Sequence, residues 1–304
     1  MNELTAIKVI FIFVMFFSAA IAGSVPIFSK SFRNNKKLIS TGNCFAAGIF
    51  LIVGVVHLLR ESQESFEEAL KEEMPVGYVV ALGGYTMILF IENILFGGHN
   101  HDIEEPSKNQ GSLVNERSEI VILNKEKPLE EEFARPDPQP ECENAECPVT
   151  KPHASHNEYI PGIILTTALI VHSIFEGIAG GLLTTKSSVI SVGIAILIHN
   201  IPAAIALGVK LEKASKTVSI ILMFLFVLSS PLGIAIGISL SELAYPIIRA
   251  IFLSISAGTF IYIGCTEILA EEMHDKSNKI LKFTGFIVGF VPLAMAAIFI
   301  KEED

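Results

Sequence analysis

The amino-acid sequence predicts an all-α polytopic membrane protein with eight transmembrane helices and both termini outside the cytosol. Apolar residues make up 51% of the 304 residues, and a mean hydropathy of +0.54 is too high for an ordinary soluble protein of this size. Eight separate apolar runs each have the length of a membrane-spanning helix. Lysine and arginine residues concentrate in alternate connectors between these runs.

The eight runs occupy more than half of the chain, so little remains for a separate soluble domain. In chain order, the predicted spans 1 to 8 are Leu4–Phe28, Leu38–Leu59, Pro75–Phe96, Tyr159–Leu183, Val189–Leu211, Val218–Leu240, Pro246–Ala270 and Ile280–Ile300. Span 1 could also be interpreted as a cleaved signal peptide, because AAIAG at 19–23 offers small residues. Its apolar stretch is too long for that, and Lys8 alone does not make a basic leader, so a spanning helix is favoured.

Residues 1–98 thus hold spans 1–3, and residues 159–304 hold spans 4–8. Residues 99–158 are rich in Glu, Pro and Asn and poor in aromatic residues, which predicts a largely disordered loop. This loop also contains short histidine clusters and a pair of cysteines. They are expected either to receive an emerging metal ion or to be chance features of a polar loop.

The positions of lysine and arginine predict the orientation, because these residues favour cytosolic connectors. Four, six, three and three of them follow spans 1, 3, 5 and 7, which is 16 of the 22 in the chain. Both termini are therefore expected on the extracytosolic side, and the loop 99–158 in the cytosol. The extracytosolic connector Glu61–Glu73 carries six carboxylates, and it is expected either to concentrate cations or to be a plain solvated acidic loop.

Span 4 contains HSIFEGIAGG, residues 172–181, which places polar side chains in the middle of an apolar run. His172 and Glu176 are four residues apart, so they project from one helix face about 6 Å from each other. An imidazole and a carboxylate at this spacing form half of a site for a divalent transition metal such as zinc. Gly177 and Gly180 allow another helix to pack closely, so the polar pair is expected to face protein and not lipid.

Span 5 contains HNIPAAIALG, which begins at His199. Because the connector between spans 4 and 5 is short, the two helices must be antiparallel neighbours. His172 and His199 then both lie about 15 to 17 Å from the extracytosolic ends of their helices, near the bilayer centre. Pro202 frees a backbone carbonyl beside His199. Neutral, hydrogen-bonded histidines in a packed bundle are the structural alternative, but the shared depth of these side chains with Glu176 favours a metal site.

Other polar residues are placed where they could line a route for an ion. His57 and Glu61 are four residues apart at the extracytosolic end of span 2, and Glu267 lies toward the cytosolic end of span 7. We expect His57 and Glu267 to take part in metal passage because they lie deeper in their spans. Glu61 is expected either to join them or to be an ordinary interfacial charge.

Four segments resemble signatures of the Zrt-, Irt-like protein (ZIP) family of divalent metal transporters. HSIFEGIAGGL and HNIPAAIALG are similar to the family patterns of helices 4 and 5. AGTFIYIGCTEIL is similar to the helix 7 pattern, and NCFAAGIFLIVGVVHLLRES to that of helix 2. The resemblance covers the whole membrane region and leaves out only the loop 99–158. It implies a 3+2+3 bundle, in which spans 1–3 and 6–8 are inverted repeats around spans 4 and 5.

The resemblance further implies that spans 1, 4, 5 and 6 move against spans 2, 3, 7 and 8 and carry metal toward the cytosol within a homodimer. Some members have a further carboxylate four residues after the helix 5 histidine, where this chain has Ala203. A second metal ion in the same site is therefore not expected. The expected shell of the single metal ion consists of His172, Glu176 and His199, completed by Ser173, Asn200 or water.

The sequence thus predicts a secondary transporter for a divalent transition metal, with zinc as the first expectation and iron as the alternative. The metal is the transported substrate, and no resident cofactor is expected. An intramembrane zinc-dependent hydrolase and a metal-sensing receptor are the other interpretations, although the H-E-x-x-H pattern is absent. The expected partners are the metal ion, membrane lipid and a second copy of the chain, but no nucleic acid. The plasma membrane is the expected location, with an organelle membrane as the alternative.

Overall fold

The computed structural model describes residues 2–95, 160–240 and 246–299, and these residues form helices joined by short turns, without a strand. Eight helical segments among them are long and apolar enough to cross a membrane, which confirms the eight predicted spans. The predicted loop 99–158, with its histidine and cysteine clusters, lies outside the described residues.

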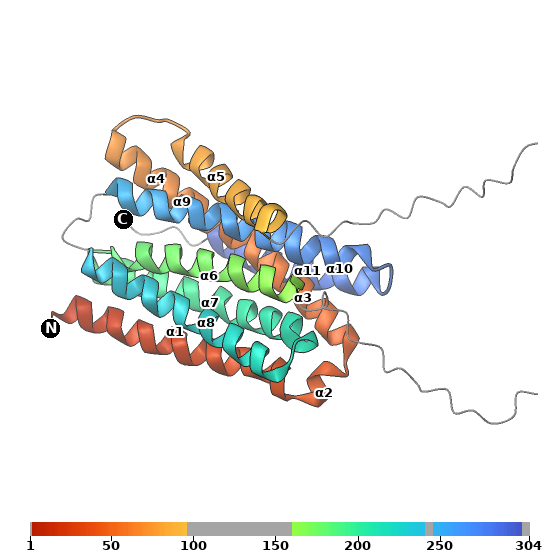
Figure 1. Cartoon of the computed structure of the whole chain (residues 1–304). Coiled ribbons are helices and arrows are strands. Elements are labelled where there is room, and N and C mark those ends of the chain that lie inside the picture. Colours follow the sequence, from red (N-terminus) through yellow and green to blue (C-terminus); the bar gives the residue numbers. More distant parts are fainter. Residues whose placement is uncertain (1, 96–159, 241–245, 300–304) are drawn as a thin grey trace, which may run out of the picture. The chain divides into compact units, whose positions relative to one another are not determined.

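The elements are named as in Figure 1. In chain order they are α1 (Glu3–Phe28), α2 (Lys30–Arg33), α3 (Lys36–Ile52), η1 (Val53–Leu58), α4 (Leu59–Leu70), α5 (Val76–Phe90), η2 (Ile91–Leu95), α6 (Ile160–Gly181), α7 (Lys186–Lys210), η3 (Leu211–Lys213), α8 (Lys216–Ser239), α9 (Pro246–Tyr262), η5 (Ile263–Leu269), α10 (Ala270–His274) and α11 (Lys279–Phe299). Span 2 runs without interruption through α3, η1 and α4, and span 7 through α9, η5 and α10. We call the end of the bundle where α1 begins the terminal end, and the end where α7 meets α8 the loop end.

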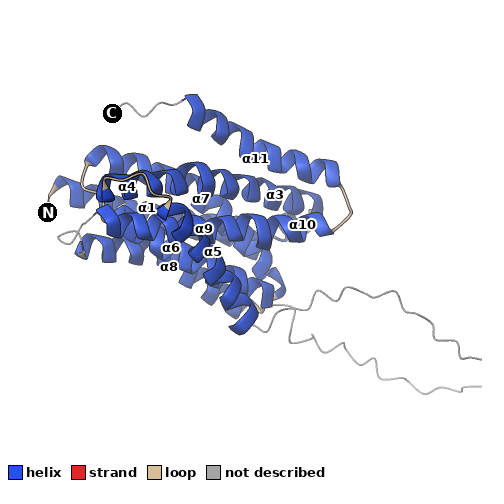
Figure 2. Ribbon diagram, turned by 90° about the horizontal axis from the view of Figure 1, so that it is seen from above, coloured by secondary structure: helices blue, strands red, loops and turns tan. Residues whose placement is uncertain are grey.

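The eight spans form two groups of four. In the first group, α1 packs on α7 and α8, and α6 packs on α8; in the second group, α11 packs on α3, and α5 packs on α9. Figure 1 shows the first group as the lower layer and the second group as the upper layer, and Figure 2 shows α11 running alongside α3. Contacts between the groups come mainly from α6 against α9 and from α7 against α3.

This packing follows the inverted repeat. An inverted repeat that relates spans 1–3 to spans 6–8 also relates span 5 to span 4. It therefore relates the pair of spans 1 and 5 to the pair of spans 6 and 4, and the two helices of each pair pack against each other. Spans 2 and 8 correspond in the same way to spans 7 and 3. Spans 2 and 7 also share a local feature, because each contains a π-helical stretch, η1 or η5. Such stretches often mark functional positions.

The connector after span 2 was predicted to be a loop, and this conformation was wrong. Residues expected as an acidic loop form α4, which extends the helix from Leu59 to Leu70. Glu, Gln, Ala and Leu are good helix formers, and the stretch is amphipathic, with Phe66 and Ser62 buried. The helix stops at Lys71, whose φ of 55° lies in the left-handed region typical of helix ends. Span 7 likewise continues past its predicted end to His274.

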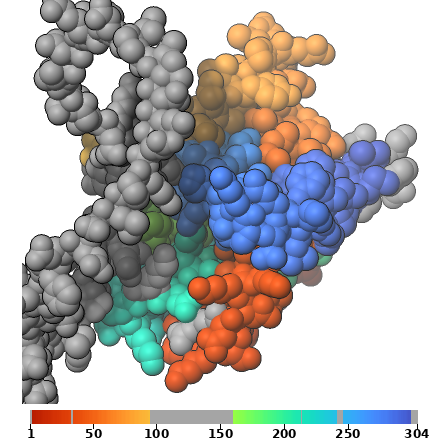
Figure 3. Space-filling view, turned by 90° about the vertical axis from the view of Figure 1, so that its right-hand side faces the viewer, coloured from red at the N-terminus to blue at the C-terminus, as the bar shows by residue number. Residues whose placement is uncertain are grey.

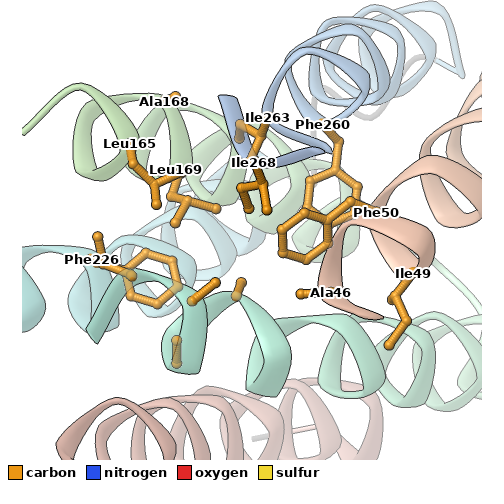
Figure 4. Close-up of a cluster of buried hydrophobic side chains, with 14 of the residues drawn as sticks. Ala46, Ile49, Phe50, Leu165, Ala168, Leu169, Phe226, Phe260, Ile263 and Ile268 are labelled. Carbon is orange, nitrogen blue, oxygen red and sulfur yellow. The ribbon is translucent and has the colours of Figure 1, made fainter. Parts of the chain in front are cut away.

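Buried apolar side chains fill the space where the two groups meet. Phe50 of α3 and Phe260 of α9 pack with ring centroids 4.5 Å apart. Leu165 and Leu169 of α6 face them together with Phe226 of α8, as Figure 4 shows. The core therefore joins both groups around the middle of α6, the helix that carries His172.

Lys8 ties α1 to the end of α6. Its side chain is buried, with 4% exposed, and the ammonium donates a hydrogen bond of 2.6 Å to the carbonyl oxygen of Gly181. The last carbonyls of a helix lack partners within the helix and carry partial negative charge, so a cation is stabilising there. The one basic residue of span 1 therefore caps the helix that holds His172 and Glu176.

Candidate metal site

Three predicted ligands meet at one place. His172, Glu176 and His199 offer ligand atoms that all lie within 4.8 Å of one another. Glu176 Oε2 lies 3.5 Å from Nε2 of His172 and 3.0 Å from Nε2 of His199. The three side chains are 2–3% exposed. Within the described ranges, this is the cluster of His, Cys, Asp or Glu groups that comes close enough to share a cation.

The sequence places these side chains through two local features. Residues four apart on α6 share a face, so His172 and Glu176 point in one direction. The connection of α6 to α7 reverses the chain over residues 182–185, and α7 returns at Lys186, which brings His199 to the same level. The predicted antiparallel neighbours are thereby confirmed. The closest partner of α6 is nevertheless α8, against which Gly177 and Gly181 pack.

Several polar atoms of this cluster lack hydrogen-bond partners although they are buried. They are Nε2 of His172, Oε1 of Glu176 and Nδ1 of His199. Buried polar groups in native proteins are nearly always satisfied, and an unsatisfied one costs about 1–3 kcal/mol. One carboxylate and two imidazoles match the donor set that Zn²⁺ and its neighbours in the transition series prefer. Ser173 and Asn200 are also buried, and their part as further ligands stays a prediction.

The structure adds residues of α9 that sequence reasoning missed. Nδ1 of His172 lies 2.9 Å from Oγ of Ser256 and 3.1 Å from its carbonyl oxygen. Phe260 stacks on the imidazole of His172, with centroids 4.1 Å apart and planes within 8°. The helix 7 resemblance covers Phe260, but no feature of the sequence reveals that this face of α9 lies against His172.

A cavity of about 810 Å³ lies on the terminal side of this cluster. It is lined by α3, η1 and α4 on one side and by α7 and α11 on the others, and it follows α7 from Ser187 to Ile198, the residue before His199. This stretch of α7 is about 17 Å long. The cavity therefore extends from the terminal end to the level of His199.

His57 and Glu61 line this cavity, outside the cluster of three ligands. Nε2 of His57 lies 3.9 Å from Oε2 of Glu61, and both side chains are partly exposed. Glu61 also forms an ion pair with Arg249 of α9, which donates a further hydrogen bond of 3.1 Å to Ser65. Much of the charge of Glu61 is therefore offset by a residue that is distant in the sequence.

At the loop end, ion pairs join the two groups, and hydrogen bonds join spans 2 and 7 within the second group. Lys210 of α7 lies 3.9 Å from Glu267 of η5 and pairs with Glu271 of α10. Glu272 of α10 accepts hydrogen bonds from Asn43 and Ser40 of α3. Figure 3 views this end, where the blue α10–α11 hairpin lies beside the orange-red beginning of α3. Glu267, like His57 and Glu61, lies outside the cluster of three ligands.

Similarity to known proteins identifies the family of this chain. A family model described as ZIP zinc transporter matches residues 5–297. The chain belongs to the ZIP zinc transporter family. The zinc transporter ZIP1 of Takifugu rubripes is 28% identical over 312 aligned residues, which are 97% of this chain and 98% of the relative. The ZIP1 of Danio rerio is 29% identical over 271 residues, 86% and 85% of the two chains. The human zinc transporter ZIP3 is 26% identical over 330 residues, 99% and 100% of the two.

As a ZIP protein with eight spans, the chain is an integral, multi-pass membrane protein of a metal-transport family and not an enzyme. The hydrolase interpretation of the sequence is thereby set aside. Ala203, one turn after His199, is buried with 3% exposed and brings no carboxylate to the cluster. Glu176 is thus the one acid among the three clustered candidate ligands.

Proposed function

We propose that this ZIP protein carries a divalent transition metal, zinc first and iron second, toward the cytosol through a site formed by His172, Glu176 and His199. The observation that carries the proposal is the convergence of three buried ligand atoms from two helices within 4.8 Å. The zinc-transporting relatives, aligned over nearly their whole length, support the choice of zinc. Ser173, Asn200 or water would complete the shell, because zinc in proteins usually takes four ligands.

The direction of transport is part of the proposal. The lysine and arginine bias assigns the terminal end to the extracytosolic side and the loop end to the cytosol. The cavity lined by His57 then opens to the outside and would admit hydrated ions. Glu61, which Arg249 partly neutralises, would guide ions rather than hold them. We place the transporter in the plasma membrane as a homodimer.

At the opposite end, tight packing around Lys210 supports an exit that is closed in this conformation. Asn43, Leu165, Ala206, Ile268 and Glu272 meet there around Lys210, and the described side chains leave no room for a water molecule between them. These residues come from both groups of spans. Movement of one group against the other would separate them and expose Glu267 to the departing ion, as alternating access requires.

The transport activity can be tested with the purified protein in liposomes that contain a zinc-sensitive dye. His199→Ala removes one of the three proposed ligands, and we expect zinc uptake to fall by about 100-fold. Even the loss of a residue that only orients a metal ligand lowers metal affinity or activity by about 10- to 100-fold. His274→Ala, an exposed histidine of α10, serves as the control and should keep the wild-type rate. Wild-type uptake by His199→Ala would refute the site, and absence of uptake by the wild-type protein would favour a receptor.

The closed exit gives a second prediction. Lys210→Met keeps the length of the side chain but removes its charge, so the ion pairs with Glu267 and Glu271 are lost. An ion pair of this kind contributes about 1 kcal/mol, which is roughly five-fold in the population that is open at the loop end. The fully buried Cys44 of α3, next to Asn43, should then react about five-fold faster with a membrane-impermeant maleimide applied from the loop side.

The measurement uses a protein in which the three other cysteines are replaced by serine. Lys210→Arg retains the charge and should label at the same rate as the parent protein. Equal labelling rates for the methionine and arginine variants would show that the ion pairs do not hold the exit closed.

A further inference from the structure

We propose that Ser256 of α9 is a positioning residue for metal transport. It fixes the imidazole of His172 with its proton on Nδ1, so that the lone pair of Nε2 faces Glu176. This inference rests on the proposed function, because it assigns a task to a neighbour of the proposed ligand. Ser256 is fully buried and belongs to the second group of spans, whereas His172 belongs to the first.

The hydrogen bonds around Nδ1 decide the tautomer. The carbonyl oxygen of Ser256, 3.1 Å from Nδ1, can only accept a hydrogen bond, so the ring nitrogen must donate. The Ser256 hydroxyl, 2.9 Å away, accepts from the same N–H and directs its own proton toward the carbonyl oxygen of His172 at 3.4 Å. Thr259 donates to the Ser256 carbonyl at 2.8 Å and thereby holds that acceptor in place. With Nδ1 protonated, Nε2 is the ligand atom, and it is the buried nitrogen that has no hydrogen-bond partner.

Phe260 fixes the plane of the same ring. It stacks on His172 with the planes within 8°, and its centroid lies 4.9 Å from that of His199. Phe50 of α3 in turn packs against Phe260, with the two ring centroids 4.5 Å apart. A rotation of the imidazole that moved Nδ1 toward Glu176 would break the contacts with Ser256 and Phe260. One face of α9 therefore sets both the protonation pattern and the orientation of the ligand.

The location of Ser256 links ligand orientation to the transport movement. Contacts between α6 and α9 cross the boundary between the two groups of spans. In the conformation described, His172 is oriented for binding by a residue of the opposite group. When α6 moves relative to α9, the imidazole leaves Ser256 and loses the hydrogen bonds that orient it and raise its strength as a ligand. The site then binds metal more weakly in the arrangement from which the metal is released.

The test compares Ser256→Ala with Ser254→Ala. Ser254 lies on the same helix, is equally buried, and its hydroxyl has no hydrogen-bond partner among the described residues, so it is a matched control. We expect Ser256→Ala to raise the zinc dissociation constant of the detergent-solubilised protein, and the KM of liposome uptake, by about ten-fold. Ser254→Ala should leave both values at the wild-type level. Ser256→Thr, which restores a hydroxyl acceptor, should recover most of the affinity.

Further measurements separate this inference from the proposed function. If Ser256→Ala proves unstable, Thr259→Val removes the group that holds the Ser256 carbonyl with little change in volume, and its KM should rise as well. Equal dissociation constants for Ser256→Ala, Ser254→Ala and the wild type would overturn the inference. Glu176→Gln provides the reference for the site itself. Loss of binding in that variant, together with normal binding by Ser256→Ala, would refute the positioning role and leave the metal site intact, whereas normal binding by Glu176→Gln would refute the site.

Discussion

Glu176→Gln is expected to abolish zinc transport while the protein remains folded. Glutamine keeps the size and shape of glutamate but removes the one negative charge among the three proposed ligands. Residues that only support a metal ligand are worth about 10- to 100-fold in affinity, so the loss of an anionic ligand should lower transport by at least about 100-fold. Two imidazoles and an amide do not replace the attraction between a carboxylate and a dication in a buried site.

The same variant should respond differently to zinc in a thermal unfolding experiment. Zinc at 100 times its dissociation constant stabilises a folded protein by about 2.7 kcal/mol, so the Tm of the wild type should rise with zinc concentration. Glu176→Gln should show no such rise. Its Tm without zinc should equal or exceed that of the wild type, because Oε1 of Glu176 is buried without a partner.

Glu68→Gln is the matched control for both measurements, since Glu68 is an exposed residue of α4 remote from the cluster. It should keep the wild-type transport rate and the zinc-dependent rise in Tm. A Glu176→Gln protein that transports zinc normally would mean that the three converging side chains serve the packing of α6 against α7 and not the metal.

The cluster could be predicted from the sequence because its geometry is local. The spacing of His172 and Glu176 fixes their common face, and a short connector fixes the level of His199 relative to them. The cost of burying such groups in an apolar span also indicated a function. The eight spans were predictable for a similar reason, since their length and hydropathy are properties of continuous segments.

The surroundings of the predicted polar residues were not predictable, because they depend on contacts between distant parts of the chain. Arg249 lies 188 residues from Glu61, and Ser256 lies 84 residues from His172. Nothing in the local sequence indicates which face of α9 meets α4 or α6. The end of span 2 was missed for another reason: the charges of α4 suggest a loop by composition, while its helix formers and its buried Phe66 determine a helix.

The crossing of α6 and α8 gives the other prediction with a large expected effect. A Cβ atom on Gly237 would lie 2.7 Å from Cα of Gly181 and closer still to the carbonyl oxygen of Ile178. Gly177 and Gly233 make the same kind of contact one turn away, so the helices approach backbone to backbone, as small residues permit in membrane proteins. Because backbone atoms cannot turn aside as a side chain can, Gly237→Ala should destabilise the protein by about 3 kcal/mol. Gly237→Leu should give no folded protein in detergent.

Gly83→Ala on α5 makes the same chemical change without a collision, since nothing lies within 4 Å of the added Cβ. Alanine favours a helix interior over glycine by about 1 kcal/mol, so this variant should be neutral or more stable. The opposite changes in stability expected for Gly237→Ala and Gly83→Ala can be measured as a lower and an unchanged or higher Tm of the detergent-solubilised variants. Gly177 is next to Glu176, so a crossing forced apart at Gly237 would also displace the carboxylate from His199. If Gly237→Ala kept both the wild-type Tm and the zinc-dependent rise, the close crossing would not be what positions α6.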